Sequence, residues 1–358
     1  MPELPEVETV ARDLRPKLVG ARIVGARCSW ARTLRTHTPE EFAEAIAGHD
    51  VEAVGRRGKQ LVIELSDGFA LTIHLKMTGQ LFVVPSTAPV DPYVRLVLEL
   101  GDGRDLRFRD IRKFGKVGLY RRIASGELVL AEGGPGVFST TGPEPLDDAF
   151  TLRAFRHRLR AHKGRLKPLL LNQAFVAGMG NIYADEALWL ARLHPLRSAS
   201  SLRPSDEARL YRAIRSVLAE AVERRGSSID DYTAPDGDGE MQEQLQVYQR
   251  TGEACPRCGR PIRRIVIGAR STHFCSWCQR LPAADRRASG AILRTQSPAL
   301  GSGPRWTKLH ADEGVVGLTA AETRRALARA RSERTRRAAE TRRAAARAAM
   351  GPAVVGSA

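Results

Sequence analysis

The sequence predicts a multidomain α+β protein with a strand-rich first part, a helical middle and a small metal-binding module. Three observations predict this class. Apolar and polar residues alternate in segments between residues 19 and 125, apolar residues recur at helical spacing from about 145 to 225, and four cysteines form two close pairs. Alternation is typical of strands, whereas a period near 3.6 is typical of helices. With 358 residues, the chain is long enough for two or three domains that each bury a core.

A first helix is expected near residues 5–18. Apolar residues recur at helical spacing behind Pro5, which suits the first turn of a helix. Glu3 and Glu6 lie where the helix dipole favours negative charge. These roles account for the opening stretch MPELPEVETV except for Pro2.

The strand-rich zone contains six alternating segments, which read RIVGAR, KQLVIEL, FALTIHL, YVRLVLEL, RDLRFRD and KVGLYRR. Asp-Gly pairs at 67 and 102 are hairpin turn signals, so we expect an antiparallel sandwich or barrel. Cys28 stands alone in a strand-like run and is expected to be a small buried side chain rather than a reactive thiol.

The helical zone includes DEALWLARL and SDEARLYRAIRSVLAEAVERR, with Ser205 and Asp206 at a helix start. A loop rich in Gly, Asp and Pro, SSIDDYTAPDGDGE, leads to the cysteine module. We therefore expect domains at 1–130, 145–245 and 246–282, followed by a basic tail at 283–358.

The tail differs in composition from the rest of the chain. It begins as a linker that mixes Gly, Ser and Pro, and residues 319–350 then hold ten Arg and three Glu, a net charge of +7. Thr319 and Glu322 fit a capping box, but the stretch has hardly any apolar face. We expect a flexible, solvated arm rather than a packed helix, and the arm is a candidate accessory contact for nucleic acid.

The formal net charge of +17 favours a polyanionic partner such as nucleic acid, with a solvated basic surface as the alternative. No apolar run approaches the roughly 20 residues of a membrane span. The N-terminus carries charges where a signal peptide has its apolar segment. We therefore expect a cytoplasmic protein with no membrane partner.

The cysteines Cys255, Cys258, Cys275 and Cys278 have the spacing C-x2-C-x16-C-x2-C. In a reducing cytoplasm, two such pairs indicate a zinc site rather than disulfides. Four thiolates complete a tetrahedron and leave no open position for water. The sequence thus predicts one structural Zn²⁺.

Pro2 allows amine chemistry at the N-terminus. Met1 before a small residue is normally removed, which leaves the secondary amine of Pro2 as the terminus. An N-terminal amine has a pKa of roughly 8, against about 10.4 for lysine, so a larger fraction is unprotonated at neutral pH. Such an amine is a nucleophile toward a carbon such as a sugar C1′, where it forms an iminium, and Glu3 beside it is placed to move a proton. At this point helix capping alone and amine chemistry both remain open.

The motifs resemble those of the bacterial formamidopyrimidine-DNA glycosylases up to about residue 281. The matching segments, in the order of the family, are MPELPEVETV, GRRGKQLVIEL, IHLKMTGQL, RDIRKFG, GPEPL, VAGMGNIYADEAL, LQVYQRTGEACPRCGRPI and RSTHFCSWCQR. Leu4 favours this branch over the related endonuclease VIII branch, which typically has glycine at this position. Residues from 283 onward have no counterpart in the family pattern.

The resemblance implies a fold and an activity. The fold is an N-terminal catalytic β-sandwich with a leading helix, a helix–two-turn–helix domain with a lesion-covering loop, and a C-terminal zinc-finger β-hairpin. The activity is base excision repair by a bifunctional DNA glycosylase and AP lyase, acting as a monomer on damaged double-stranded DNA. Such an enzyme removes 8-oxoguanine and formamidopyrimidines through a Schiff base and then cleaves the backbone by β,δ-elimination.

The resemblance also assigns catalytic roles to individual residues. Pro2 matches the Schiff-base nucleophile, and Glu3 matches the acid that assists ring opening and iminium formation. Lys59 matches the proton donor for β-elimination, although a lysine on a basic strand, taken alone, is usually a phosphate contact. Arg270 matches the zinc-hairpin arginine that assists δ-elimination and binds the target's phosphate.

Further matches concern DNA binding. A glycosylase must flip its target out of the duplex, and Met77, Arg112 and Phe114 resemble the trio that fills the gap. As isolated residues, Met77 and Phe114 would be interpreted as core residues, and at a hairpin tip both interpretations remain open. Asn181 stands at a helix start, which presents free N–H groups to a phosphate, and Lys167 is expected to contact the DNA backbone with it.

The chain also departs from the family pattern. Asp91, Pro92 and Tyr93 stand where the family usually has a histidine that contacts DNA, and Met241 stands in the lesion-covering loop where an aromatic residue is common. Two alternatives remain: an endonuclease VIII-like enzyme for oxidised pyrimidines, and a non-catalytic zinc-ribbon DNA-binding module in which Pro2 and Glu3 are dispensable.

Overall fold

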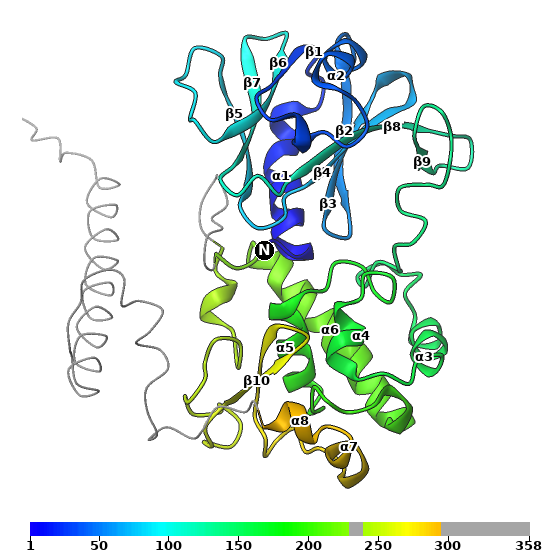
Figure 1. Cartoon of the computed structure of the whole chain (residues 1–358), viewed down its shortest axis with the longest axis vertical. Helices are drawn as coiled ribbons and strands as arrows, with labels where there is room; N and C mark the ends of the chain where they lie inside the picture. Colours follow the sequence, from blue (N-terminus) through cyan, green and yellow to red (C-terminus); the bar gives the residue numbers. More distant parts are fainter. Residues whose placement is uncertain (229–238, 295–358) are drawn as a thin grey trace, which may run out of the picture. The chain divides into compact units, whose positions relative to one another are not determined.

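The computed structural model describes residues 1–228 and 239–294, and a leading helix, a strand-rich zone, a helical zone and a hairpin follow in the expected order (Figure 1). The helices are α1 (Leu4–Leu18), α2 (Pro39–Ile46), α3 (Leu152–Arg160), α4 (Leu166–Leu171), α5 (Asn181–Leu190), α6 (Pro204–Glu223), α7 (Ala283–Arg287) and α8 (Gly290–Leu293). The strands are β1 (Ile23–Cys28), β2 (Val51–Arg57), β3 (Gln60–Leu65), β4 (Phe69–His74), β5 (Gly79–Pro85), β6 (Val94–Leu100), β7 (Arg104–Asp110), β8 (Lys116–Arg122), β9 (Leu128–Val129), β10 (Arg263–Ile267) and β11 (Arg270–Phe274). The capping box expected at Thr319 and Glu322, the Arg-rich tail and most of the loop SSIDDYTAPDGDGE lie outside the described residues.

The strand-rich zone forms two antiparallel sheets, with strand orders β1-β6-β7-β5 and β2-β3-β4-β8-β9. Asp67 lies in the β3–β4 turn with a positive φ of 60°, and the second Asp-Gly pair lies between β6 and β7 as expected. The six predicted segments correspond to β1, β3, β4, β6, β7 and β8. β2 and β5 escaped prediction because several positions on each are only partly buried, which weakens the alternation. Cys28 ends β1 half-buried, and burial raises the pKa of its thiol.

Helix α1 supplies one wall of the sandwich core. Val7, Val10 and Leu14 are buried on one helical face and share a core with β-strand residues, which include Ile23, Leu61, Leu71, Leu98 and Phe108. The capping box is present, since the Glu3 N–H donates to a carboxylate oxygen of Glu6 over 2.7 Å. The helix therefore begins at the expected place, one residue after Glu3.

Leu4 packs against a different core from the rest of α1. It is buried among the helices of the middle zone, whose core includes Phe155, Leu170, Tyr183, Leu188, Ile214 and Leu218. Its N–H donates to the carbonyl of Gly178 over 3.0 Å. Gly178 has a φ of +80°, and a Cβ there would lie 2.5 Å from the Leu4 Cβ, so only glycine admits this contact. The start of α1 is thus fastened to the helical zone.

Helix α6 begins at Pro204, one residue before the predicted start at Ser205. The Asp206 carboxylate accepts the N–H of Arg203 over 3.2 Å and pairs with Arg197 over 2.7 Å. A carboxylate in this position also offsets the helix dipole. Within residues 1–228 and 239–294, the helices are all too short or too polar to cross a bilayer.

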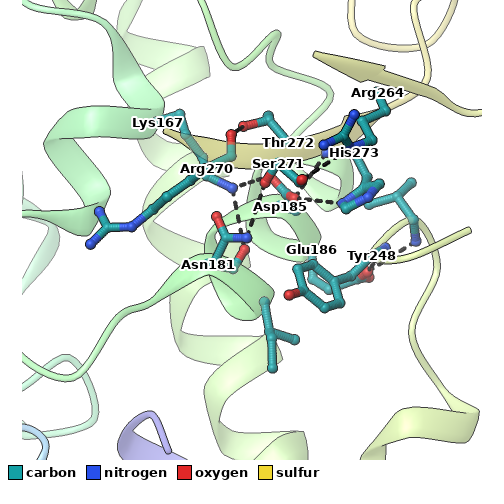
Figure 2. A network of polar contacts seen from close by, with 12 residues as sticks. Lys167, Asn181, Asp185, Glu186, Tyr248, Arg264, Arg270, Ser271, Thr272 and His273 are labelled. Atoms are coloured by element: carbon teal, nitrogen blue, oxygen red, sulfur yellow. Dashed lines mark hydrogen bonds and ion pairs between the residues drawn. The ribbon is translucent and has the colours of Figure 1, made fainter. Parts of the chain in front are cut away.

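The hairpin β10–β11 turns at Gly268 and Ala269 and docks on α5, as Figure 2 shows. The Asp185 carboxylate of α5 accepts the His273 N–H over 2.9 Å, and the Asn181 amide donates to the Ser271 carbonyl over 3.0 Å. Glu186, the residue after Asp185, accepts three consecutive backbone N–H groups, at residues 246–248, from the segment that leads into the zinc module. Helix α5 therefore fixes the hairpin through buried polar contacts.

The structure corrects the role expected for Lys167. Its side chain is 0 % exposed, its ammonium pairs with Asp185, and it donates to the Asn181 carbonyl over 3.2 Å. The short helix α4 buries Leu166, Lys167 and Leu170 together, so the lysine points inward and finds its counter-charge on α5. Direct contact between Lys167 and a DNA phosphate was therefore a wrong expectation.

The structure also changes the expected start of the tail. Residues 283–294, expected to begin a flexible linker, form α7 and α8. Ile292 and Leu293 pack against a buried apolar cluster on the hairpin. The Gly, Ser and Pro residues that predicted a linker lie mostly after residue 294. The prediction therefore gave too little weight to Ile292 and Leu293, which hold the segment in place.

Replacing Lys167 by methionine separates the buried role from a DNA contact. The free energy of unfolding should fall by about 3 kcal/mol, because Asp185 is left as a buried charge without its cation. The slope of log affinity against log salt concentration should stay unchanged, whereas loss of a phosphate contact lowers it by roughly 0.9. Denaturant unfolding and duplex binding across a salt series provide the two measurements, with the exposed Lys163→Met as control. A lower salt slope at unchanged stability would refute the buried role.

Candidate active site

The Glu3 carboxylate occupies a buried place where the starts of α1 and α5 meet. Its side chain is buried and one oxygen accepts the Ile182 N–H over 2.9 Å. The other oxygen, Oε2, has no hydrogen-bond partner in the part of the chain that the structure describes. Burial raises the pKa of Glu3, the cation of Lys59 opposes this shift, and Glu6 adds to it. A carboxyl group with a raised pKa and an unused oxygen is suited to act as a proton donor.

Lys59 lies in the β2–β3 turn. Its charge lowers the pKa of Glu3 more than that of any other cation in the described part of the chain. It is only 7 % exposed; burial lowers the pKa of its ammonium, whereas Glu3 and Glu6 raise it. Gly180, the residue before α5, shows how close the groups lie. A Cβ at position 180 would lie 2.6 Å from Lys59 Nζ and would also overlap the Glu3 carboxylate. Only glycine leaves room for both side chains.

Pro2 lies directly before this carboxylate. It is buried, whereas Met1 is 45 % exposed at the end of the chain. The structure thus places the predicted nucleophile, acid and lysine together at the start of α1.

Behind Glu3 lies a hydrogen-bonded cluster that the sequence does not predict. One Glu6 oxygen accepts the Tyr183 hydroxyl over 2.5 Å and the Ser227 N–H over 2.8 Å. Burial, followed by the charge of Glu6, raises the pKa of Tyr183 well above its ordinary value, which keeps the phenol protonated as a donor. The sequence predicts only a helix-end role for Glu6, and nothing in it pairs Glu6 with residues 177 and 221 positions away.

Arg270 and Asn181 lie at the other side of the α5 start. Arg270 opens β11 with an exposed side chain, and its charge contributes to the lowered pKa of Lys59. Figure 2 shows Asn181 beside the β11 backbone, where its amide donates to the Ser271 carbonyl. Its Oδ1 has no hydrogen-bond partner among residues 1–228 and 239–294. A cation and a helix N-terminus next to each other are the elements of an anion site.

His74 lies among the cations next to Lys59. His74 is largely buried and accepts the Lys76 N–H on Nδ1 over 3.1 Å. Burial, together with the cations Lys76, Lys59 and Arg35, lowers the pKa of His74 to about 3, so this imidazole is neutral at physiological pH. His74 lies within the matched segment IHLKMTGQL, but its position there does not predict its burial among cations.

Met77, Arg112 and Phe114 lie on two neighbouring turns. Met77 is 37 % exposed in the β4–β5 turn, and Phe114 is 50 % exposed in the β7–β8 turn, so neither belongs to a core. The Arg112 guanidinium lies 5.2 Å from the Phe114 ring centroid. Thr78 joins the two turns, since its hydroxyl donates to Asp110 over 2.5 Å and accepts the Arg112 N–H over 3.2 Å. Three long side chains are thus presented together to solvent.

Asp91 and Tyr93, which replace the family's usual histidine, form a charged surface turn. Asp91 pairs with Arg109 over 2.8 Å and accepts the Tyr93 N–H over 2.6 Å. The exposed Tyr93 ring lies 5.3 Å from the Arg109 guanidinium and 5.7 Å from that of Arg95. The turn is ordered by these contacts without a histidine.

The four cysteines of the zinc module converge. The sulfur atoms of Cys255, Cys258, Cys275 and Cys278 all lie within 4.8 Å of one another. Four thiolates at this separation fit the tetrahedral coordination of one Zn²⁺ and leave no position for a reacting water. The ion is therefore structural, and it ties the base of the hairpin that carries Arg270.

Removing one zinc ligand should disable the hairpin and leave the other domains folded. Cys255→Ser is expected to lower the zinc content from one ion per chain and to weaken duplex binding by about tenfold or more, because ligand loss removes folding free energy from the module. Elemental analysis and a binding titration measure the two effects. Cys28→Ser serves as the matched control and should change neither quantity. Full zinc content and affinity in Cys255→Ser would contradict the assignment.

Comparison with known proteins follows the same division of the chain. Residues 1–117 match the formamidopyrimidine-DNA glycosylase N-terminal domain, residues 141–233 the H2TH domain of the same proteins, and residues 252–281 the zinc finger found in FPG and IleRS. The formamidopyrimidine-DNA glycosylase of Herpetosiphon aurantiacus is 50 % identical over 281 residues, which are 78 % of this chain and 100 % of that protein.

Solved structures agree with this similarity. A Lactococcus lactis FPG mutant, G226P, in complex with a Fapy-dG containing DNA has a TM-score of 0.70 and 36 % identity. MutM in complex with carbocyclic 8-oxo-G containing DNA has a TM-score of 0.70 and 37 % identity. Each match covers 78 % of this chain and 100 % of the other. The chain therefore belongs to the formamidopyrimidine-DNA glycosylase family.

Proposed function

We propose that this protein is a base-excision-repair enzyme that removes oxidised purines from double-stranded DNA and then cleaves the strand at the resulting abasic site. It is thus a DNA-formamidopyrimidine glycosylase and a DNA-(apurinic or apyrimidinic site) lyase. The relatives' complexes with Fapy-dG and 8-oxo-G DNA support the class of lesion. A chain that acts on chromosomal DNA works at the nucleoid, in the cytoplasm of a bacterium.

The observation that carries this proposal is the Glu3 carboxyl group beside Lys59 at the N-terminus. Its free oxygen and raised pKa have no structural use, since one oxygen is enough to accept the Ile182 N–H. A helix cap alone requires neither a buried lysine nor a glycine that leaves space for both side chains. An acid and an amine placed together, with a chain terminus before them, provide the groups for Schiff-base chemistry.

In the proposed reaction, the Pro2 nitrogen attacks C1′ of the flipped nucleotide. Glu3 gives a proton to the ring oxygen, and the bond from C1′ to this oxygen breaks as the sugar opens. The bond from C1′ to the base then breaks, and the base leaves with the bonding electrons and takes up the proton that the Pro2 nitrogen loses, which leaves the iminium. Loss of a proton from C2′ then breaks the bond from C3′ to oxygen, and Lys59 gives a proton to the departing phosphate. In the second elimination, which Arg270 assists, loss of a proton from C4′ breaks the bond from C5′ to oxygen. Water finally releases Pro2.

The remaining residues bind and reshape DNA in this proposal. Asn181 and the N–H groups at the start of α5 hold a phosphate with Arg270. Met77, Arg112 and Phe114 enter the space that the flipped nucleotide leaves, where Arg112 pairs with the orphaned base. Their exposure on adjacent turns supports this role.

Glu3→Gln tests the chemistry without removing the fold. Single-turnover base release should fall by about a hundredfold or more, because the amide cannot donate the proton of an acid. Duplex affinity should stay within about twofold, since the amide keeps the size and the N-terminal position. In the parent, the rate should fall as pH rises through the Glu3 pKa, which lies above its ordinary value of 4.5, because the protonated acid is lost there. The exposed Glu44→Gln is the control.

Two results would overturn the proposal. If Glu3→Gln releases base as fast as the parent, the acid assignment is wrong and the binding-module alternative gains support. If the parent excises thymine glycol in preference to 8-oxoguanine from otherwise identical duplexes, the enzyme belongs functionally with the endonuclease VIII type.

A further inference from the structure

Helices α7 and α8 lie beyond the part of the chain that the family accounts for. The zinc-finger match ends at residue 281, and α7 begins at Ala283. The segment nevertheless packs on the hairpin rather than leaving it, and Figure 1 shows α8 next to β10. Its Ser289 is almost completely buried.

The packing of α8 is apolar and involves one face of the hairpin. Ile292 and Leu293 contact a buried cluster of five residues, namely Leu196, Ile265, Ile267, Phe274 and Leu281. In an antiparallel pair, residues opposite each other point to the same face. Ile267 is opposite Arg270, and Ile265 is opposite Thr272. The Cβ of Arg270 therefore points to the same face of the hairpin that α8 covers.

Polar contacts fasten the same segment to the helical zone. The Arg165 guanidinium donates to the Ala288 carbonyl over 2.9 Å. The Ser201 hydroxyl donates to the Asp285 carboxylate over 3.0 Å. Residues 283–294 therefore contact both the hairpin and the helices on which it rests.

The hairpin needs such support. A two-stranded hairpin is at best marginally stable in water and depends on packing against other elements. The α5 contacts engage β11 through Asn181 and Asp185, whereas Ile265 and Ile267 belong to β10. Without α8, part of the apolar cluster that includes these two isoleucines would face solvent.

We propose that residues 283–294 are a brace that holds β10–β11 against the helical zone and so positions Arg270 for phosphate binding and the second elimination. Ile292 and Leu293 are positioning residues, since they act through Ile267 and its strand partner rather than on DNA. The effect on elimination rests on the proposed function, whereas the effect on the hairpin does not.

The test uses the full chain with Ile292→Ala and Leu293→Ala combined. Ala291→Ser, an exposed position on the same helix, is the matched control, and Ile292→Val with Leu293→Ile is the conservative variant. Hydrogen exchange of peptides that cover residues 263–274 should become about tenfold faster in the alanine variant, because local opening of the hairpin costs less free energy. Among the cleavage products, the share of β,δ-elimination should fall relative to β-elimination, and KM should rise more than kcat falls. The control and the conservative variant should match the parent.

Each outcome decides a part of the inference. Unchanged exchange in residues 263–274, with faster exchange confined to 283–294, would overturn the brace. Faster exchange with an unchanged product ratio and KM would overturn the positioning of Arg270. A parent that makes no elimination product would refute the proposed function, and the exchange comparison would still decide the brace.

Discussion

The hydrogen bond from the Ile182 N–H to Glu3 is the contact on which the site depends. It joins the residue directly before α1 to the first turn of α5. The bond uses one oxygen of the buried carboxyl group, and the other oxygen has no hydrogen-bond partner among the described residues. The next residue, Leu4, forms a second contact, since its N–H donates to the Gly178 carbonyl and its side chain packs against Gly178. The ends of a chain are ordinarily among its most mobile parts. Here Pro2 and Glu3 are buried, because the residues that follow them belong to two cores at once.

Helix α5 connects this contact to the zinc-module hairpin. Its start holds Glu3, its first residue holds the β11 backbone, and Asp185 one turn later binds both Lys167 and the hairpin. The zinc site secures the hairpin at its base, and α8 covers its apolar face. Under the proposed function, the groups for chemistry and for phosphate binding are therefore both held by contacts with α5.

The sequence predicted those parts whose signal is local. The helix behind Pro5, six strands and the four zinc ligands follow from spacing alone, because each reflects a repeating backbone geometry or a fixed ligand set. Lys167 was misassigned since the burial of a cation depends on Asp185, which tertiary packing brings to it. The partnership of Glu6 with Tyr183 and Ser227 was missed for the same reason. The linker predicted for residues 283–294 is wrong because two apolar side chains in a polar segment carry little signal until the surface that they cover is known.

Mapping the covalent bond to DNA tests the central claim most directly. Protein trapped with borohydride on an abasic-site duplex is digested with protease and nuclease, and tandem mass spectrometry locates the sugar remnant. The remnant should be found on the nitrogen of Pro2, in a peptide that lacks Met1. A remnant on Lys59 or another lysine, or a trapped species that retains Met1, would contradict the account.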